Sequence, residues 1–269
     1  MPFDPLSGKP AAQRRTTVSA LPGDAFSPTD LRRLDEVVRD ARSASTAQPS
    51  ALLSPLATNA EATALTSRNC VFDHCAVLLF PTTIEAGLHH LERHGLAPRP
   101  AVPSTVVRRR LSARHGVHED LCDVRITRLC LDLPTGRRHP AVEVFLFPRD
   151  SPSFTERIEA DEVAYGYENH TAFVMDAPRP AVIERLVGAW RTDAGLLWEG
   201  GGHNPHEGGP DGSTVLYFVR AAGHPGTRRR FELNCPGNVR EFTARAVPQD
   251  EGVHRAYRAW PRLTDDVPA

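Results

Sequence analysis

The chain carries an internal repeat, and this repeat constrains its fold more than any other feature. The first copy begins with an apolar strand at 71–80, followed by a helix that Thr82 caps and a glycine ends. The second copy begins with a strand at 169–175, followed by a helix that Asp176 caps and another glycine ends. Three extended segments are expected after each helix: 104–111, 124–133 and 141–147, then 196–198, 214–220 and 229–234. The order strand, helix, three strands thus occurs twice, which predicts two similar units packed together.

The predicted fold class is therefore α+β, with two tandem βαβββ modules that curl into half-barrels around one site. An N-terminal extension is expected at 1–67, partly disordered because residues 1–26 are rich in Pro, Ser, Thr and Gly. One helix is expected in it near 28–42, which Ser27 can cap, and a second loose stretch at 43–67. The modules are placed at 68–155 and 165–245, and a C-terminal tail at 246–269.

The composition excludes several classes of partner. The formal net charge of -1 gives no field that would attract nucleic acid or an anionic membrane. No stretch approaches the roughly 20 apolar residues of a membrane span, and no export signal is recognised at the start. The five cysteines, an odd number, argue against a disulfide framework. A cytoplasmic protein with reduced thiols is expected, acting on a small molecule.

The repeat carries the same two residue types at equivalent positions. His74 and His170 open the two first strands, and Glu143 and Glu232 lie near the start of the two last strands. If the modules pack about a pseudo-twofold axis, these four side chains meet. Imidazole nitrogens and carboxylate oxygens are ligands that divalent metals accept. A single such residue in a strand is usually only a polar group on a solvated face; two matched pairs favour a metal site.

These segments resemble a known superfamily over about 72–237. Phe72-Asp-His74-Cys-Ala-Val and Asn169-His170-Thr-Ala-Phe-Val look like the strand openings of the vicinal-oxygen-chelate superfamily of glyoxalases, bleomycin-resistance proteins and extradiol dioxygenases. Phe231-Glu232-Leu resembles its closing metal-ligand strand. The resemblance implies metal ligands at His74, His170 and Glu232.

Two chemistries are open within that superfamily. In the preferred one, two His and one Glu hold Fe(II) and leave positions for substrate and dioxygen. By resemblance to type I extradiol dioxygenases, His139 and His203 would act as acid/base residues and Tyr217 as a hydrogen-bond donor to the substrate. The expected function is then a non-haem Fe(II) oxygenase acting on a small metal-chelating substrate.

The alternative uses Glu143 as well. A site of two His and two Glu with Ni, Zn or Mn is the glyoxalase pattern of an isomerase or lyase. Glu143 departs from the typical extradiol pattern, whereas His139 and His203 have no evident role in a glyoxalase. A metal-free binding protein of the drug-sequestering kind is a third hypothesis. The site could form within one chain or be completed across a homodimer.

The local pattern of two further stretches predicts their structure. The arginines 108–110 are expected in a strand, where they cannot all face the same way. The glycine-rich stretch at 200–212 is expected to be a hairpin connection or a mobile loop that brings His203 over the metal.

Overall fold

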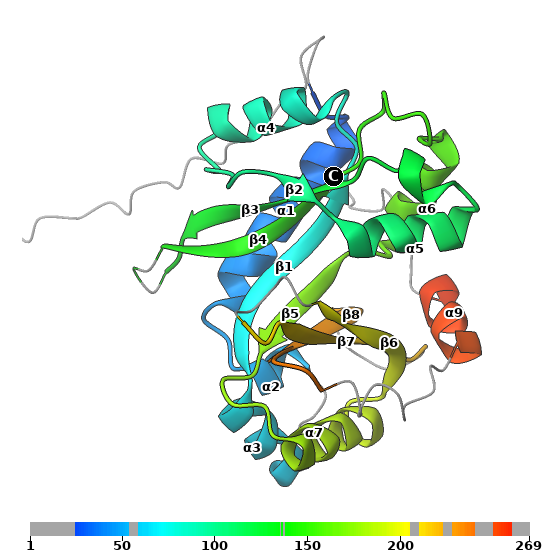
Figure 1. Cartoon of the computed structure of the whole chain (residues 1–269). Coiled ribbons are helices and arrows are strands. Elements are labelled where there is room, and N and C mark those ends of the chain that lie inside the picture. Colours follow the sequence, from blue (N-terminus) through cyan, green and yellow to red (C-terminus); the bar gives the residue numbers. More distant parts are fainter. Residues whose placement is uncertain are drawn as a thin grey trace, which may run out of the picture.

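The computed structural model describes residues 25–53, 59–134, 136, 138–204, 210–222, 228–239 and 250–259. Within these ranges the chain is a mixed α+β protein built on one open, eight-stranded sheet (Figure 1). The strands are β1 Val71–Leu79, β2 Val102–Pro103, β3 Arg125–Asp132, β4 Arg138–Leu146, β5 His170–Val174, β6 Leu196–Asn204, β7 Ser213–Arg220 and β8 Arg230–Pro236. The helices are α1 Pro28–Ala44, α2 Pro49–Leu52, α3 Ala60–Asn69, α4 Ile84–Arg93, α5 Thr105–His115, α6 Glu156–Tyr165, α7 Pro180–Thr192 and α9 Asp250–Ala259, with a 3-10 turn η2 at Glu119–Leu121.

The strand order across the sheet is β2-β3-β4-β1-β5-β8-β7-β6. In the first half, β1 runs parallel to β4, the last strand of that half. In the second half, β5 runs parallel to β8 in the same way. An antiparallel pair, β1 with β5, joins the halves at the centre of the sheet. The first strands of the two halves are therefore neighbours, and each lies beside the last strand of its own half.

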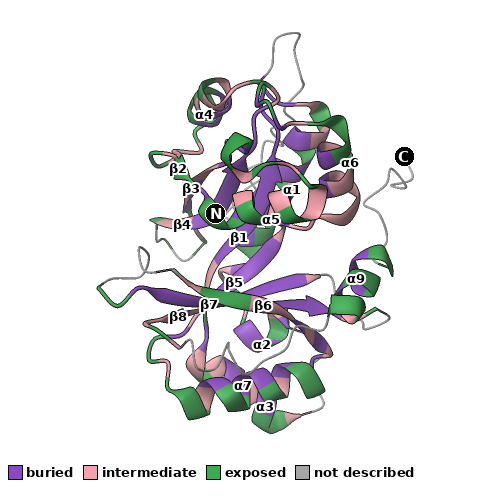
Figure 2. Ribbon diagram, turned by 45° about the vertical axis from the view of Figure 1, so that its right-hand side comes forward, coloured by how far each residue is buried: buried purple, intermediate pink, exposed green. Residues whose placement is uncertain are grey.

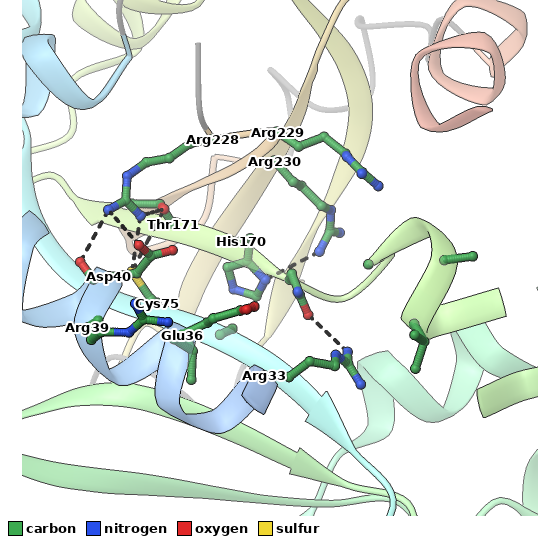
Figure 3. A pocket seen from close by; sticks show the side chains of 16 residues that line it. Arg33, Glu36, Arg39, Asp40, Cys75, His170, Thr171, Arg228, Arg229 and Arg230 are labelled. Carbon is green, nitrogen blue, oxygen red and sulfur yellow. Dashed lines mark hydrogen bonds and ion pairs between the residues drawn. The ribbon is translucent and has the colours of Figure 1, made fainter. Parts of the chain in front are cut away.

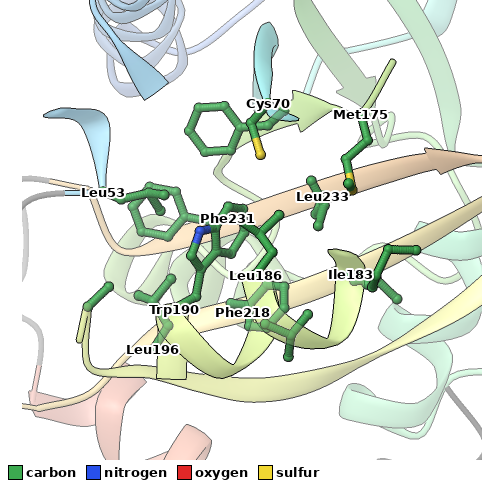
Figure 4. Packing of buried hydrophobic residues seen from close by; sticks show 14 of the residues in the cluster. Leu53, Cys70, Met175, Ile183, Leu186, Trp190, Leu196, Phe218, Phe231 and Leu233 are labelled. Carbon is green, nitrogen blue, oxygen red and sulfur yellow. The ribbon is translucent and has the colours of Figure 1, made fainter. Parts of the chain in front are cut away.

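Alternate residues of β1 face two different layers of apolar side chains, as the period of a strand requires. Cys75, Val77 and Leu79 pack with α1 and α4. Ala76 and Leu78 face the other way and pack with α5 and α6. The second half of the sheet packs on α3 and α7 around Trp190, which is fully buried (Figure 4). Figure 2 shows buried residues running along the central strands and the inner faces of these helices.

The expected strand at 104–111 is wrong. Val102 and Pro103, which precede the expected strand, pair with β3, and the chain then forms the helix α5. Val107 and Leu111, four residues apart, are the buried positions of α5, and Gly116 ends it with a φ of 68°. The arginines at 108–110 therefore lie on a helix and not in a strand.

The N-terminal extension has more regular structure than expected. α1 covers the helix expected at 28–42 and continues to Ala44, with Ser27 accepting from the N–H of Asp30. Ala25 and Phe26 are buried against the sheet, so part of the segment expected to be loose is packed. The stretch 43–67 contains α2 and most of α3, where Asn59 caps α3. Residues 1–24 lie outside the described residues, and so do 246–249 and 260–269 of the tail, whose middle part forms α9.

Two other findings bear on the expectations. The five cysteines are free thiols, four of them buried. In the part of the chain that the structure describes, no helix is both long and apolar enough to cross a membrane.

Candidate metal centre

Four neighbouring strands bring His74, Glu143, His170 and Glu232 to one face of the sheet. His74 on β1 pairs with Ala172 on β5, and Ala172 pairs with Glu232 on β8. Residues paired across strands point to the same face. Ala76, two residues after His74, pairs with both His170 and Glu143. The four side chains therefore share the face that α5 and α6 cover further along β1.

The head groups of these side chains converge. The two Nε2 atoms of His74 and His170 are 3.3 Å apart. Glu143 Oε2 lies 3.6 Å from the Nε2 atom of His74, and Glu232 Oε2 lies 3.2 Å from that of His170. One ligand atom from each of His74, Glu143 and His170 lies within 4.8 Å of the other two. All four residues are buried, with 0–6% of their surface exposed.

The opposite nitrogen of each imidazole is held by an acceptor. His74 Nδ1 lies 2.7 Å from the Asp73 carboxylate, and His170 Nδ1 donates to the carbonyl of Glu168 at 2.8 Å. A carbonyl or carboxylate oxygen only accepts, so each Nδ1 atom carries a proton, and the two Nε2 atoms are left to share a proton with each other and with Glu232 or to bind a cation. Two lone pairs facing each other at 3.3 Å repel unless a proton or a cation lies between them. The donor set, the burial and this tautomer arrangement all fit a divalent metal.

Arg128 on β3 links two acidic residues beside the histidines. Its Nη1 donates to Asp73 Oδ2 at 3.0 Å, and its Nε lies 3.0 Å from Glu143 Oε1. Burial pushes the pKa of Asp73 upward, but the hydrogen bond and charge of His74 and the charge of Arg128 outweigh it and hold this pKa below its ordinary value. The half-buried Asp73 carboxylate is thus kept charged.

The protonation of Glu232 and of His74 depends on the charged groups around them. Burial favours the neutral Glu232 carboxyl, but its hydrogen bond with His170 and the nearby His74 lower its pKa to about 2. Burial and the charge of Arg128 favour neutral His74, yet Glu143 and Asp73 outweigh them and raise the pKa of His74. The charged carboxylate is the form that binds a metal.

Tyr217 on β7 lies next to the centre. It pairs across the strands with Glu232, and its ring is 6.1 Å from the His170 ring, edge to face. The guanidinium groups of Arg110 and Arg230 lie over this ring, at 4.0 and 4.5 Å from its centroid. Burial, followed by the charge of Glu232, raises the pKa of Tyr217, so its hydroxyl keeps its proton and can donate.

His139 and His203 are placed differently from the four residues above. His139 on β4 donates from Nε2 to the backbone carbonyl of Asp73 at 2.9 Å, so Asp73 connects it to the centre. His203 lies in β6, where its Nε2 donates to the carbonyl of Asp211 at 3.1 Å. The stretch expected as a loop from 200 is strand as far as Asn204; residues 205–209 lie outside the described residues. His203 and Tyr217 line a cavity of about 500 Å³ between α5 and the β6–β7 pair.

A second cavity, of about 340 Å³, reaches His170 from the side of α1 (Figure 3). It lies between α1 and the segment that leads into β8. Arg128 and the residues of α1 that line this cavity were not found from the sequence. Asp73 directly precedes His74, and this adjacency was the one feature of the sequence that pointed to a residue supporting the histidines.

The similarity of this chain to known proteins is low. No family model matches the sequence, and no curated protein matches it. Among solved structures, a mutant of 4-hydroxymandelate synthase from Streptomyces coelicolor is similar with 12% sequence identity and a TM-score of 0.27. The match covers 75% of this chain and 56% of that one, so this chain corresponds to little more than half of its length.

Proposed function

We propose that this chain is a metal-dependent enzyme of the vicinal-oxygen-chelate type, and that it is an oxygenase. His74, His170 and Glu232 would hold the metal, with Fe(II) preferred because two His and one carboxylate are the ligand set of non-haem Fe(II) oxygenases. The observation that carries the proposal is the pair of Nε2 atoms 3.3 Å apart, each freed by a hydrogen bond on Nδ1. The arrangement costs free energy without a cation or proton between them.

When bound, the metal supplies Lewis acidity toward two oxygens of the substrate and, as Fe(II), electrons for dioxygen. The chain's own residues set the conditions for this. Burial of the four head groups excludes water and strengthens their electrostatic interactions. Tyr217, whose ring contacts the guanidinium groups of Arg110 and Arg230, is a protonated donor beside the centre. We assign it the hydrogen bond to the substrate.

The Arg128–Glu143 ion pair favours three protein ligands over four. Arg128 balances the charge of Glu143 through Oε1, so this carboxylate has a partner other than a metal. Three protein ligands would leave more of the metal open to a chelating substrate and a second reactant than four protein ligands would.

A second function is favoured by the other oxygen of Glu143. Oε2 lies 3.6 Å from His74 Nε2 and belongs to the cluster of ligand atoms within 4.8 Å. If Glu143 is a ligand, the site is the two-His, two-Glu centre of a glyoxalase-like isomerase or lyase with Ni, Zn or Mn. His139 and His203, the acid/base residues of the oxygenase hypothesis, contact the backbone carbonyls of Asp73 and Asp211, and His139 also lies 3.8 Å from the Asp73 carboxylate.

Two further proposals concern the organisation of the sheet and the binding partner. The two halves of the sheet are proposed to be tandem βαβββ modules, because in each half the first and last strands are parallel neighbours. The partner is proposed to be a small molecule, bound within one chain or in a homodimer.

The test compares Glu143→Gln with Glu232→Gln in anaerobically purified protein. Metal content and oxygen uptake are measured with catechols and 2-oxo acids as candidate substrates. The oxygenase proposal expects iron, kept by Glu143→Gln and lost by Glu232→Gln, and substrate-dependent oxygen uptake in the wild type. Nickel, zinc or manganese that both variants lose would establish the isomerase or lyase. If no sample contains metal and chelators leave ligand binding unchanged, the metal-free binding protein is the hypothesis that remains.

A further inference from the structure

The cavity that reaches His170 is lined by an unusual number of arginines. Five of them and two carboxylates, Glu36 and Asp40, contribute to its wall. With His170 neutral, the lining carries an excess of three positive charges. Figure 3 shows the arginines on two sides of the His170 ring, from α1 and from the strand entry opposite: Arg33, Arg39, Arg228, Arg229 and Arg230.

The N-terminal extension builds one wall of this cavity. Arg33, Glu36 and Asp40 follow one another on α1 at spacings of three and four residues, so they share a face of the helix. Contacts across the cavity fix α1 there. Arg228 donates to Thr171 Oγ1 on β5 at 2.8 Å and to the backbone carbonyl of Asp40 at 3.2 Å. α1 is thus tied to the strand that carries His170.

The arginines differ in how far their charges are already balanced. Arg33 and Arg230 are buried and already donate hydrogen bonds to side chains behind them, Arg33 to Glu162 and Asn169 and Arg230 to Glu199. Arg39 is exposed on α1, where its Nε contacts the carbonyl of Asp35 at 3.4 Å. Arg228 is half-buried, and its nearest carboxylate oxygen, on Asp40, is 3.8 Å away. Arg39 and Arg228 therefore supply the charge that is least balanced.

Such a cavity is suited to an oxyanion. A concave wall of one sign of charge concentrates counter-ions, and the guanidinium fork matches a carboxylate or phosphate group. The volume of about 340 Å³ is at the small end of the range for small-molecule sites. Of the four candidate metal ligands, His170 lines this cavity, so an anion bound there would reach the metal centre through the His170 ring.

We propose that this cavity binds a carboxylate or phosphate group of the substrate, with Arg39 and Arg228 as the residues that hold it and α1 as part of the site. The inference rests on the proposed function for the statement that the anion belongs to the substrate. The binding of the anion itself does not depend on a metal. It can therefore be tested on metal-free protein.

The experiment is isothermal titration calorimetry on full-length protein treated with EDTA and then freed of the chelator. Inorganic phosphate and succinate are titrated separately, in chloride buffer at constant ionic strength so that screening does not change. Arg39→Gln and Arg228→Gln test the site. Arg42→Gln, exposed on the same helix outside the cavity, and Arg109→Gln, in the cavity beside Tyr217, are the controls. Thermal unfolding of each variant reports whether it is folded.

The wild type is expected to bind one of the two anions, which also tells a phosphate site from a carboxylate site. Losing a charged hydrogen bond should weaken that binding about tenfold or more in each site variant. Both controls should bind like the wild type. The proposal is overturned if neither anion binds, if a folded Arg39→Gln variant binds as tightly as the wild type, or if Arg109→Gln alone loses binding. If the protein binds an anion but takes up no metal, the anion site is supported and the proposed metal-dependent function is contradicted.

Discussion

The carboxylate of Asp73 accepts a hydrogen bond from His74 Nδ1 at 2.7 Å and is itself held by Arg128 at 3.0 Å. This contact fixes the tautomer of His74, so that Nε2 presents its lone pair toward His170. Carboxylates in this position orient metal-binding histidines and raise their basicity. Asp73 is therefore a positioning residue for the candidate metal centre.

Replacing Asp73 with Asn should weaken metal binding without removing it. An amide can orient either its carbonyl or its NH₂ group toward Nδ1, and it carries no charge. The loss expected for such a partner is about 10- to 100-fold in metal affinity. Competition with a chromophoric chelator measures the affinity directly. Asp132→Asn, at the exposed end of β3, is the matched control and should leave the affinity unchanged; equal affinities for Asp73→Asn and the control would contradict the role.

The Glu162 carboxyl should make the protein less stable as the pH rises through the weakly acidic range. Burial raises the pKa of this carboxyl to about 7, from an ordinary 4.5, although Arg33 lowers it. The folded chain then keeps a proton that the unfolded chain releases between pH 4.5 and 7, so the free energy of unfolding falls across this window. The contribution of this group is roughly 2–3 kcal/mol.

Glu162→Gln removes that titration and keeps an acceptor for the N–H of Glu168, which donates to Glu162 Oε1 at 3.1 Å. Urea unfolding of the variant and the wild type from pH 4.5 to 7.5 measures the difference between them. The free energy of unfolding of the variant is expected to increase steadily relative to that of the wild type as the pH rises. Glu156→Gln, exposed on the same helix, serves as the control. A difference that stays constant over the window would show that Glu162 does not titrate there.

Trp190 joins the N-terminal extension to the second half of the sheet. Its indole N–H donates to Thr66 Oγ1 on α3 at 3.1 Å, and its ring packs edge to face on Phe218. Trp190→Ala should cost about 3–5 kcal/mol of unfolding free energy because it leaves a large cavity. Thr66→Val should cost about 1–3 kcal/mol, since it leaves the buried N–H without its acceptor. Chemical denaturation measures both; a loss below 1 kcal/mol for Trp190→Ala would mean that α7 is not part of the cooperative core.

The convergence of the two histidines and two glutamates could be expected from the sequence, because each pair lies at equivalent positions of a repeat. The antiparallel pairing of β1 with β5 then brings the equivalent positions together. The side chains that orient and balance them could not be expected. Arg128 reaches Asp73 from 55 positions along the chain, and only the register of β3 on β4 places it opposite Glu143.

The error at 104–111 has a physical cause that the sequence did contain. The two valines favour a strand, but the arginines are good helix formers, Val107 and Leu111 have the spacing of a helix, and Gly116 is a helix-ending glycine. The local preference for a strand is overridden because these two side chains pack with Ile158 of α6. The arginines of that helix thereby reach Glu168 and Tyr217, contacts that depend on tertiary structure alone.

The most direct test of the proposed metal centre is the metal content per chain of His170→Ala beside the wild type, after anaerobic purification and reconstitution with Fe(II). His89→Ala, an exposed histidine on α4, is the control for surface binding. The centre predicts about one metal ion per chain in the wild type and the control, and a loss of nearly all of it in His170→Ala. Equal metal content in all three proteins, or none in the wild type, would contradict the assignment of a metal to these residues.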